Sequence, residues 1–488
     1  MESKGNSKYE ELTDQAFQID GPIYEDRSIN DYSLREYRTV SQPDLLNTSL
    51  QIQVAGSSGY YLLLSEAYVE VQFNIQVAAG GGAYDGSVVD GTTDIALENG
   101  VNSMFSYGEL SIGGVTVERV QNMHQVAHLR NLLTYSPQNN DALGLAMGFL
   151  PETGDSGTGY ADSREFTIDT LVKTAVYNAA PSVVTTTSPA LVSRRGTYNR
   201  TFALRRASQI STSGATQFQN SMLIPLKQLF GFASARKAIR GANLTINLTR
   251  RPHAGMLFAS GTAAAGQVNI SKCSLWLPLL TPSDRVLRPL ESLFASGYAA
   301  RYPYVIGNCY YGSNDTTLSR SYKQMVSGRL QSVYAAIQVD SNDSSQTYNT
   351  LIYQNSHLTD ISVWLNGVRI PAMQSYTPMY VPGTQSYTRP FLELQRMAKH
   401  LDPDTSCGIT YRNFPSAYPI YGFDCSQENH IIAPSATTCD LEVRCNLDGV
   451  VKFDGSVGTN ARLVVWTFTE SEMEIGSIGS SISVRSMI

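Results

Sequence analysis

ELSIGGVTVERVQNMHQVAHLRNLLTY, residues 109–135, gives the first indication of the fold. Apolar and polar residues alternate on both sides of Gly113 and Gly114, which predicts two strands joined by a two-residue hairpin, because glycine accepts the positive φ of such a turn. The apolar period then changes, and we expect a helix over residues 118–134. Its core-facing side chains are predicted to be Val120, Met123, Ala127 and Leu133.

A similar unit occurs in the second half of the chain. DISVWLNGVRIP (360–371) has two β-type runs around an Asn-Gly pair, and a helical pattern follows in RPFLELQRMAKHL (389–401). Similar numbers of strand-like runs lie on either side of TPSDRV (281–286). This organisation favours two sandwiches of one type in tandem.

The rest of the sequence is dominated by short runs rich in Val, Ile, Thr and aromatic residues, separated by polar, glycine-rich loops. Only two further helices are expected, over residues 226–239 and 284–297. Frequent loops and few helical periods indicate an all-β sandwich architecture. The strand-like runs are 50–54, 67–77, 243–250, 267–280, 330–339 and 461–470.

His124 and His128 lie four residues apart on the first expected helix, the spacing of zinc-binding histidines. The position that holds the general-base glutamate in H-E-x-x-H enzymes is Gln125, and no third ligand follows nearby. We therefore predict no metal at this pair. We place both histidines on the polar face of the helix and interpret them as a candidate pH-sensitive contact between subunits, because imidazole titrates near pH ~6.5.

No other catalytic motif is present. The sequence has no phosphate-binding G-x-x-x-x-G-K-[ST], no G-x-G-x-x-G between strand and helix, and no G-x-S-x-G nucleophile elbow. The six cysteines are scattered without a C-x-x-C pair, so we expect them to be reduced. These patterns predict a protein that is not an enzyme and needs no cofactor or metal.

Composition points to a surface used for contacts. Charged residues make up 16% of the 488, against about 25% in a typical domain, and there are 28 tyrosines. Contact surfaces lose Lys and Glu and gain Tyr. Residues 1–17 lack the basic and apolar regions of a signal peptide, and no apolar run reaches the ~20 residues of a membrane helix. We expect a protein that is not secreted and has no transmembrane segment.

Charge is unevenly distributed. Residues 170–283 contain no Asp or Glu but 13 Lys or Arg, which leaves 23 basic residues against all 42 acidic ones elsewhere. Such segregation favours contact with an acidic neighbouring subunit or with a packaged polyanion. The candidate inter-subunit or genome-facing cluster is Arg194, Arg195, Arg200, Arg205 and Arg206.

Several segments together resemble the double jelly-roll major capsid proteins of the adenovirus-hexon and Polinton lineage, and in particular those of adintovirus-like, Polinton-like and virophage elements. The resemblance extends from about residue 40 to 475. The segments that carry it are 99–135, MLIPLKQLFGFASARKAIRGANLTINLTRR (222–251), SKCSLWLPLLTPSDRVLRPLESL (271–293), NTLIYQNSHLTDISVWLNGVRIP (349–371) and YPIYGFDCSQ (418–427).

The resemblance implies two tandem eight-stranded jelly-roll sandwiches with short helices in their loops: an arm (1–40), a first jelly roll (41–282), a second (283–475) and a tail (476–488). It further implies a homotrimeric, pseudo-hexameric capsomer that tiles the icosahedral shell of a DNA virus or virus-like element, within the virion. Implied partners are other capsomers, penton or vertex proteins, minor cement proteins and, without sequence specificity, packaged DNA. From the residues alone, a non-catalytic carbohydrate-binding or adhesive β-sandwich protein remains the alternative.

Overall fold

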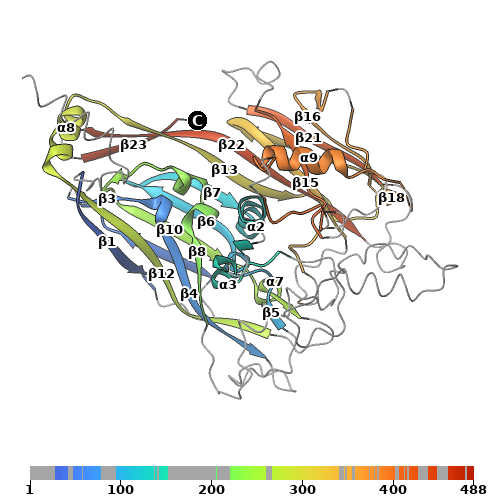
Figure 1. Cartoon of the computed structure of the whole chain (residues 1–488), viewed down its shortest axis with the longest axis horizontal. Coiled ribbons are helices and arrows are strands. Elements are labelled where there is room, and N and C mark those ends of the chain that lie inside the picture. The colour runs from blue at the N-terminus through green and yellow to red at the C-terminus, as the bar shows by residue number, and fades with distance from the viewer. Residues whose placement is uncertain are drawn as a thin grey trace, which may run out of the picture.

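Figure 1 shows a computed structural model of the chain, in which two β-sandwiches lie side by side. The part that it describes is residues 28–41, 48–57, 59–77, 95–136, 138–139, 142–151, 205, 220–259, 266–339, 346, 349–353, 358–372, 374–378, 380–381, 384–401, 406–411, 413–414, 417–426, 438–447, 460–478 and 481–487.

The first sandwich is built from three antiparallel sheets within these residues. The largest has the order β8-β4-β12-β3-β9, with β1 also paired to β12, and the facing sheet has the order β2-β10-β6-β7. A small sheet pairs β11 with β5. The strands are β1 (Ile29–Arg38), β2 (Ser49–Val54), β3 (Tyr61–Leu62), β4 (Tyr68–Val77), β5 (Ile95–Leu97), β6 (Phe105–Ile112), β7 (Val115–Gln121), β8 (Asn220–Pro225), β9 (Ile239–Arg240), β10 (Leu244–Arg250), β11 (Leu257–Ala259) and β12 (Gly266–Pro282).

The second sandwich has the same two-layer plan. One sheet has the order β13-β22-β15-β20, with β23 also paired to β22, and the other has the order β14-β21-β16-β17. A short ribbon pairs β18 with β19. The strands are β13 (Ala300–Tyr311), β14 (Ser319–Ser327), β15 (Arg329–Val339), β16 (Leu358–Leu365), β17 (Val368–Ile370), β18 (Tyr380–Val381), β19 (Thr384–Gln385), β20 (Tyr421–Asp424), β21 (Thr438–Leu447), β22 (Ala461–Ile478) and β23 (Ser481–Met487).

Short helices occupy the connections. The α-helices of the described part are α2 (Met123–Thr134), α3 (Leu143–Met147), α6 (Leu226–Leu229), α7 (His253–Met256), α8 (Asp284–Ala295) and α9 (Thr388–Met397). The 3₁₀ helices are η1 (Leu64–Glu66), η2 (Val101–Met104) and η4 (Gly231–Ser234). Helix α8 joins the end of β12 to the start of β13, and thus links the two sandwiches (Figure 1).

Alternating burial confirms the strand predictions. In β10 the side chains of Leu244, Ile246 and Leu248 are buried, while the residues between them are half-buried. Both predicted hairpins form, with positive φ at Gly113 and Gly114 in the first and at Asn366 and Gly367 in the second. A single cluster of buried apolar side chains extends through both sandwiches.

Two helix predictions were wrong in extent. The helix expected from residue 118 begins at Met123, because residues 118–121 pair with β6 and Asn122, at φ 47°, separates strand from helix. The helix expected over 226–239 is only α6 followed by η4. There the N–H groups of Gly231 and Phe232 donate to the Glu118 carboxylate instead of continuing a helical ladder.

The chain ends also differ from the expected arm and tail. Residues 29–38, which we assigned to the arm, form β1 and pair with β12 from Arg38–Ser274 to Ile29–Pro282. Residues 481–487, which we assigned to the tail, form β23 along β22. Strand pairing satisfies the backbone of both segments even though neither supplies a core-forming pattern.

Candidate functional site

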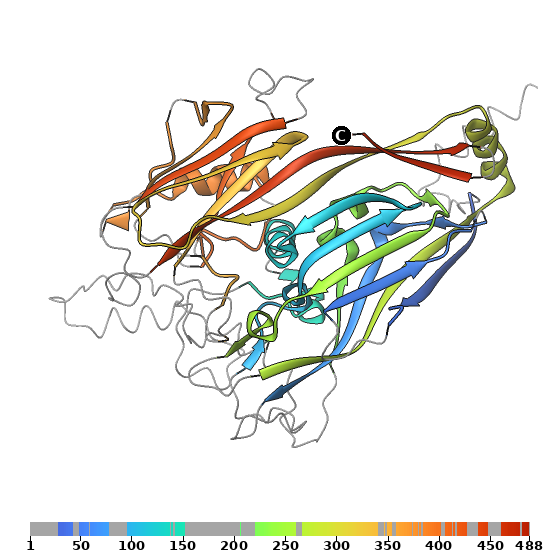
Figure 2. The ribbon, with the colours of Figure 1, turned by 180° about the vertical axis from the view of Figure 1, so that it is seen from behind.

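The junction between the two sandwiches is centred on α2, which lies between them (Figures 1 and 2). Val120, Met123 and Ala127 are buried, as predicted for the core-facing side, and Leu133 is half-buried. The opposite face is buried too, with His124 4% and His128 0% exposed. The prediction of an outward polar face was therefore wrong, because the second sandwich covers that face.

Burial determines the charge of both histidines. His124 Nε2 lies 3.2 Å from the Tyr311 hydroxyl, and the Asn99 amide lies 3.3 Å from His128 Nδ1. Burial lowers the pKa of His128 to about 3, and burial together with neighbouring arginines holds the pKa of His124 well below its usual value. Both rings are neutral at neutral pH, so the predicted titration near pH 6.5 was wrong for the folded chain.

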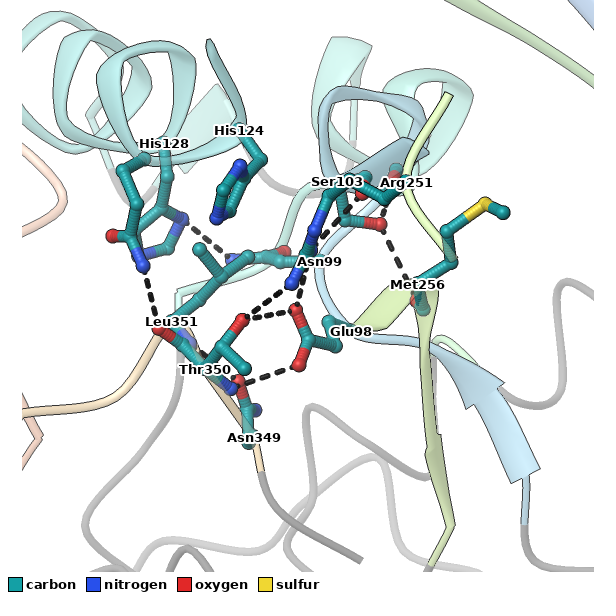
Figure 3. Close-up of polar contacts among 12 residues, drawn as sticks. Glu98, Asn99, Ser103, His124, His128, Arg251, Met256, Asn349, Thr350 and Leu351 are labelled. Carbon is teal, nitrogen blue, oxygen red and sulfur yellow. Dashed lines mark hydrogen bonds and ion pairs between the residues drawn. The ribbon is translucent and has the colours of Figure 1, made fainter. Parts of the chain in front are cut away.

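A buried ion pair lies beside the histidines, where the first sandwich meets the second (Figure 3). Arg251 Nη1 is 3.1 Å from Glu98 Oε2, and their side chains are 5% and 0% exposed. From the second sandwich, Thr350 donates its backbone N–H to Glu98 Oε1 at 2.8 Å and its hydroxyl to Oε2 at 2.6 Å. Burial raises the pKa of Glu98, while Arg251 and Thr350 oppose that rise. The carboxylate thus binds groups from both sandwiches.

Further polar contacts extend this network. Arg251 also donates to the Ser103 carbonyl and the Thr350 hydroxyl, each at 3.1 Å. The Thr350 carbonyl accepts the Gln125 side-chain amide of α2 at 2.8 Å, and Gln125 in turn accepts the Tyr353 hydroxyl. Polar contacts therefore connect β5, η2, α2 and the segment before β16.

A second buried pair, within the first half of the chain, contacts the second sandwich on the other side of α2. Arg130 Nη2 lies 3.6 Å from Glu118 Oε1 and donates to the Val305 carbonyl of β13 at 3.4 Å. Burial raises the pKa of Glu118 and lowers that of Arg130. Gly231 completes the contact, since a Cβ there would lie 1.8 Å from the Val305 oxygen. Only glycine allows the two backbones to approach this closely.

This arrangement is suited to rigidity rather than chemistry. Polar groups that are buried and hydrogen-bonded fix one relative placement of the parts that carry them. Across the described ranges, no group of three or more His, Cys, Asp or Glu side chains is placed to hold a metal. Within the same ranges, no helix has the length and apolarity to cross a membrane. All six cysteines lie in the described ranges, and each is a buried thiol outside any disulfide.

The predicted arginine cluster is described at one position. Arg205 is 0% exposed and donates to the Leu150 carbonyl at 3.1 Å, so its side chain is not on the surface of the protomer. The prediction of a surface role for Arg205 was therefore wrong. Arg194, Arg195, Arg200 and Arg206 lie outside the described residues.

Exposed apolar side chains form candidate contact surfaces that the sequence reasoning did not identify. One group lies along β1 and just after it, a second lies on the linker helix α8 and the residues just after it, and a third lies on α9 and near it. The alternation of Tyr32 and Leu34 in the sequence was an available signal for the first. These groups are Ile29, Tyr32, Leu34 and Val40; Leu293 and Tyr298; and Leu392, Leu401 and Tyr411.

Comparison with known proteins identifies the architecture. No known family profile matches the sequence, and no curated protein is similar to it. Among solved structures, a chain of the Sputnik virophage is similar with a TM-score of 0.57 and 12% identity, over 94% of this chain and 89% of that one. This match extends across both sandwiches. The chain has the double jelly-roll fold.

A second double jelly roll supports the assignment. The Faustovirus major capsid protein is similar with a TM-score of 0.50 and 8% identity, over 91% of this chain and 90% of that protein. The hairpins β6–β7 and β16–β17, helix α2 and the linker α8 thus belong to one fold that extends over nearly the whole chain. Sequence identity this low explains why only three-dimensional comparison finds it.

Proposed function

We propose that this chain is a major capsid protein that trimerises into pseudo-hexameric capsomers and tiles the icosahedral shell of a DNA virus or virus-like element. The observation that carries the proposal is the double jelly roll itself, similar over nine-tenths of its length to a chain of the Sputnik virophage and to the Faustovirus major capsid protein. The role is structural rather than enzymatic, and the site of action is the virion.

The junction supports this function physically. Three copies of two rigidly joined sandwiches make a six-sided tile only if the sandwiches keep a fixed angle. The buried pairs Glu98–Arg251 and Glu118–Arg130 hold that angle with groups from both sides. Weak contacts between tiles are then multiplied by symmetry.

Contacts between copies use the exposed apolar groups on β1 and α9, and the low charge content favours such contacts. We further propose contacts with vertex and minor cement proteins, and loose contact of the basic segment 170–283 with packaged DNA. Replacing Arg194, Arg195, Arg200 and Arg206 by Ser tests this last role. Unchanged capsid yield together with an unchanged DNA content of the capsids would exclude it.

The test of the main proposal is the size and outline of the purified protein. We expect a native mass of three times 53.4 kDa and a hexagonal outline in negative-stain electron microscopy. A monomer whose melting temperature rises with added oligosaccharide would instead identify a carbohydrate-binding sandwich protein and overturn the proposal.

A further inference from the structure

Helix α8 is amphipathic, yet none of its residues is buried. Its apolar residues Val286, Leu290, Leu293 and Phe294 share one face, because the last three follow Val286 by four, seven and eight residues. All four line a cavity of about 420 Å³. An apolar helix face of this kind normally packs against another element.

Both sandwiches contribute to the walls of this cavity, which we name the linker pocket. Leu280 and Pro282 come from β12, Tyr302 comes from β13 and Ile475 comes from β22. Leu293 is 43% exposed at its edge. Helix α8 lies at one end of the molecule, where the chain passes from one sandwich to the other (Figure 1), and the pocket beside it is lined mainly by apolar side chains.

The charged groups in the lining are basic: Lys237, Arg240 and Arg301. Arg301 pairs with Glu474 at 2.9 Å, and Arg240 lies 4.0 Å from the half-exposed Glu291. Lys237 Nζ lies 5.8 Å from the centre of the Tyr302 ring, and the Arg240 guanidinium lies 5.8 Å from the centre of the Phe294 ring. Cations held over an apolar floor favour an occupant that combines carboxylates with apolar side chains.

The described chain begins at this pocket. Ser28 and Ile29 are part of its lining, and the Ser28 carbonyl accepts the Ser283 N–H at 2.9 Å. Residues 1–27 carry seven Asp or Glu and three Lys or Arg, with apolar residues at Tyr9, Leu12, Phe17 and Ile19. Asp20-Gly21-Pro22 is a turn-forming sequence shortly before Ser28.

We propose that residues 9–19 occupy the linker pocket of their own chain, with the chain reversing at residues 20–22. Apolar side chains of this acidic segment cover the exposed face of α8, and its carboxylates lie against the basic lining. The contact seals the connection between the two sandwiches. The proposal goes beyond the capsid function and does not depend on it, since it concerns the single chain.

Photo-crosslinking of the full chain tests this. Isotopically heavy chains carry p-benzoylphenylalanine in place of Phe17 and are reassembled with light wild-type chains before irradiation. Mass spectrometry then assigns each cross-link to a peptide and to one or two chains. We expect cross-links within heavy chains to residues 286–302.

Two matched variants make the result specific. Leu293→Asp is expected to reduce the cross-link about tenfold, because it removes apolar burial and adds like charge. Leu392→Asp, on α9 and similarly exposed at 49%, is expected to leave it unchanged. Cross-links to other surfaces, heavy-to-light cross-links, or equal effects of the two variants would overturn the proposal. If this cross-link is absent and Leu293→Asp abolishes binding of the chain to phosphatidylglycerol vesicles, the proposal is overturned and the pocket is assigned to a membrane surface.

Discussion

Replacing Arg251 by Met tests the importance of the buried junction. The substitution keeps most of the side-chain volume but removes the donors to Glu98, to the Ser103 carbonyl and to the Thr350 hydroxyl. Glu98 keeps its two donors from Thr350 and is 0% exposed, so its charge stays buried without a counter-ion. Breaking a buried pair from one side costs about 3–5 kcal/mol. We expect the free energy of unfolding to fall by that amount in urea titrations.

The control is Arg396→Met. Arg396 lies 3.0 Å from Glu393, a distance close to that of the buried pair, but the two side chains are 58% and 34% exposed. An exposed pair contributes about 0–1 kcal/mol. The double variant Glu98→Gln, Arg251→Met removes the unpaired charge and should be more stable than Arg251→Met alone. A loss for Arg251→Met within about 1 kcal/mol of the control, or a double variant that is less stable still, would refute this reasoning.

Two further predictions concern the same junction. His128 has a folded pKa of about 3 and an unfolded one near 6.5, so below pH ~6.5 the unfolded chain binds a proton that the folded chain excludes. The free energy of unfolding should therefore fall by up to about 1.4 kcal/mol per pH unit between pH 6 and 4. The variant His128→Asn should reduce this slope in denaturant titrations. An unchanged slope would exclude His128 as its source. Gly231→Ala places a Cβ against the Val305 carbonyl and should cost about 1–3 kcal/mol by thermal unfolding, whereas Gly59→Ala, whose Cβ has no neighbour closer than 4.0 Å, should not. Equal melting temperatures for the two glycine variants would contradict the close approach.

Local sequence patterns predicted well those elements whose conformation depends on a single strand or turn. The glycine pair at 113–114 and Asn366-Gly367 specify their hairpins through backbone conformation alone, and both were found. Helix α8 was also recognised from its own sequence. The start of α2 was not, because the backbone of residues 118–121 is used by pairing with β6, a contact that no local period reveals.

The junction was the least predictable part. His124 and His128 read as solvent-facing because they oppose the apolar stripe of their helix, and only the second sandwich makes that face interior. Glu98 and Thr350 are 252 residues apart in sequence, so nothing near either one indicates the other. The available signal was indirect: Glu98 is the one charged residue in the run IALENGVNSMF (95–105).

Helix α2 is buried on two sides by different sandwiches, and this limits which residues of the chain can change independently during evolution. Surface loops that make no contact with the other half are free to diverge separately. A substitution at Glu98, Arg130 or Thr350 leaves a polar group unsatisfied in the other half. We therefore expect these positions to vary together across related chains. One half could be exchanged for that of a distant relative only if the contacting residues on both sides of α2 were exchanged with it.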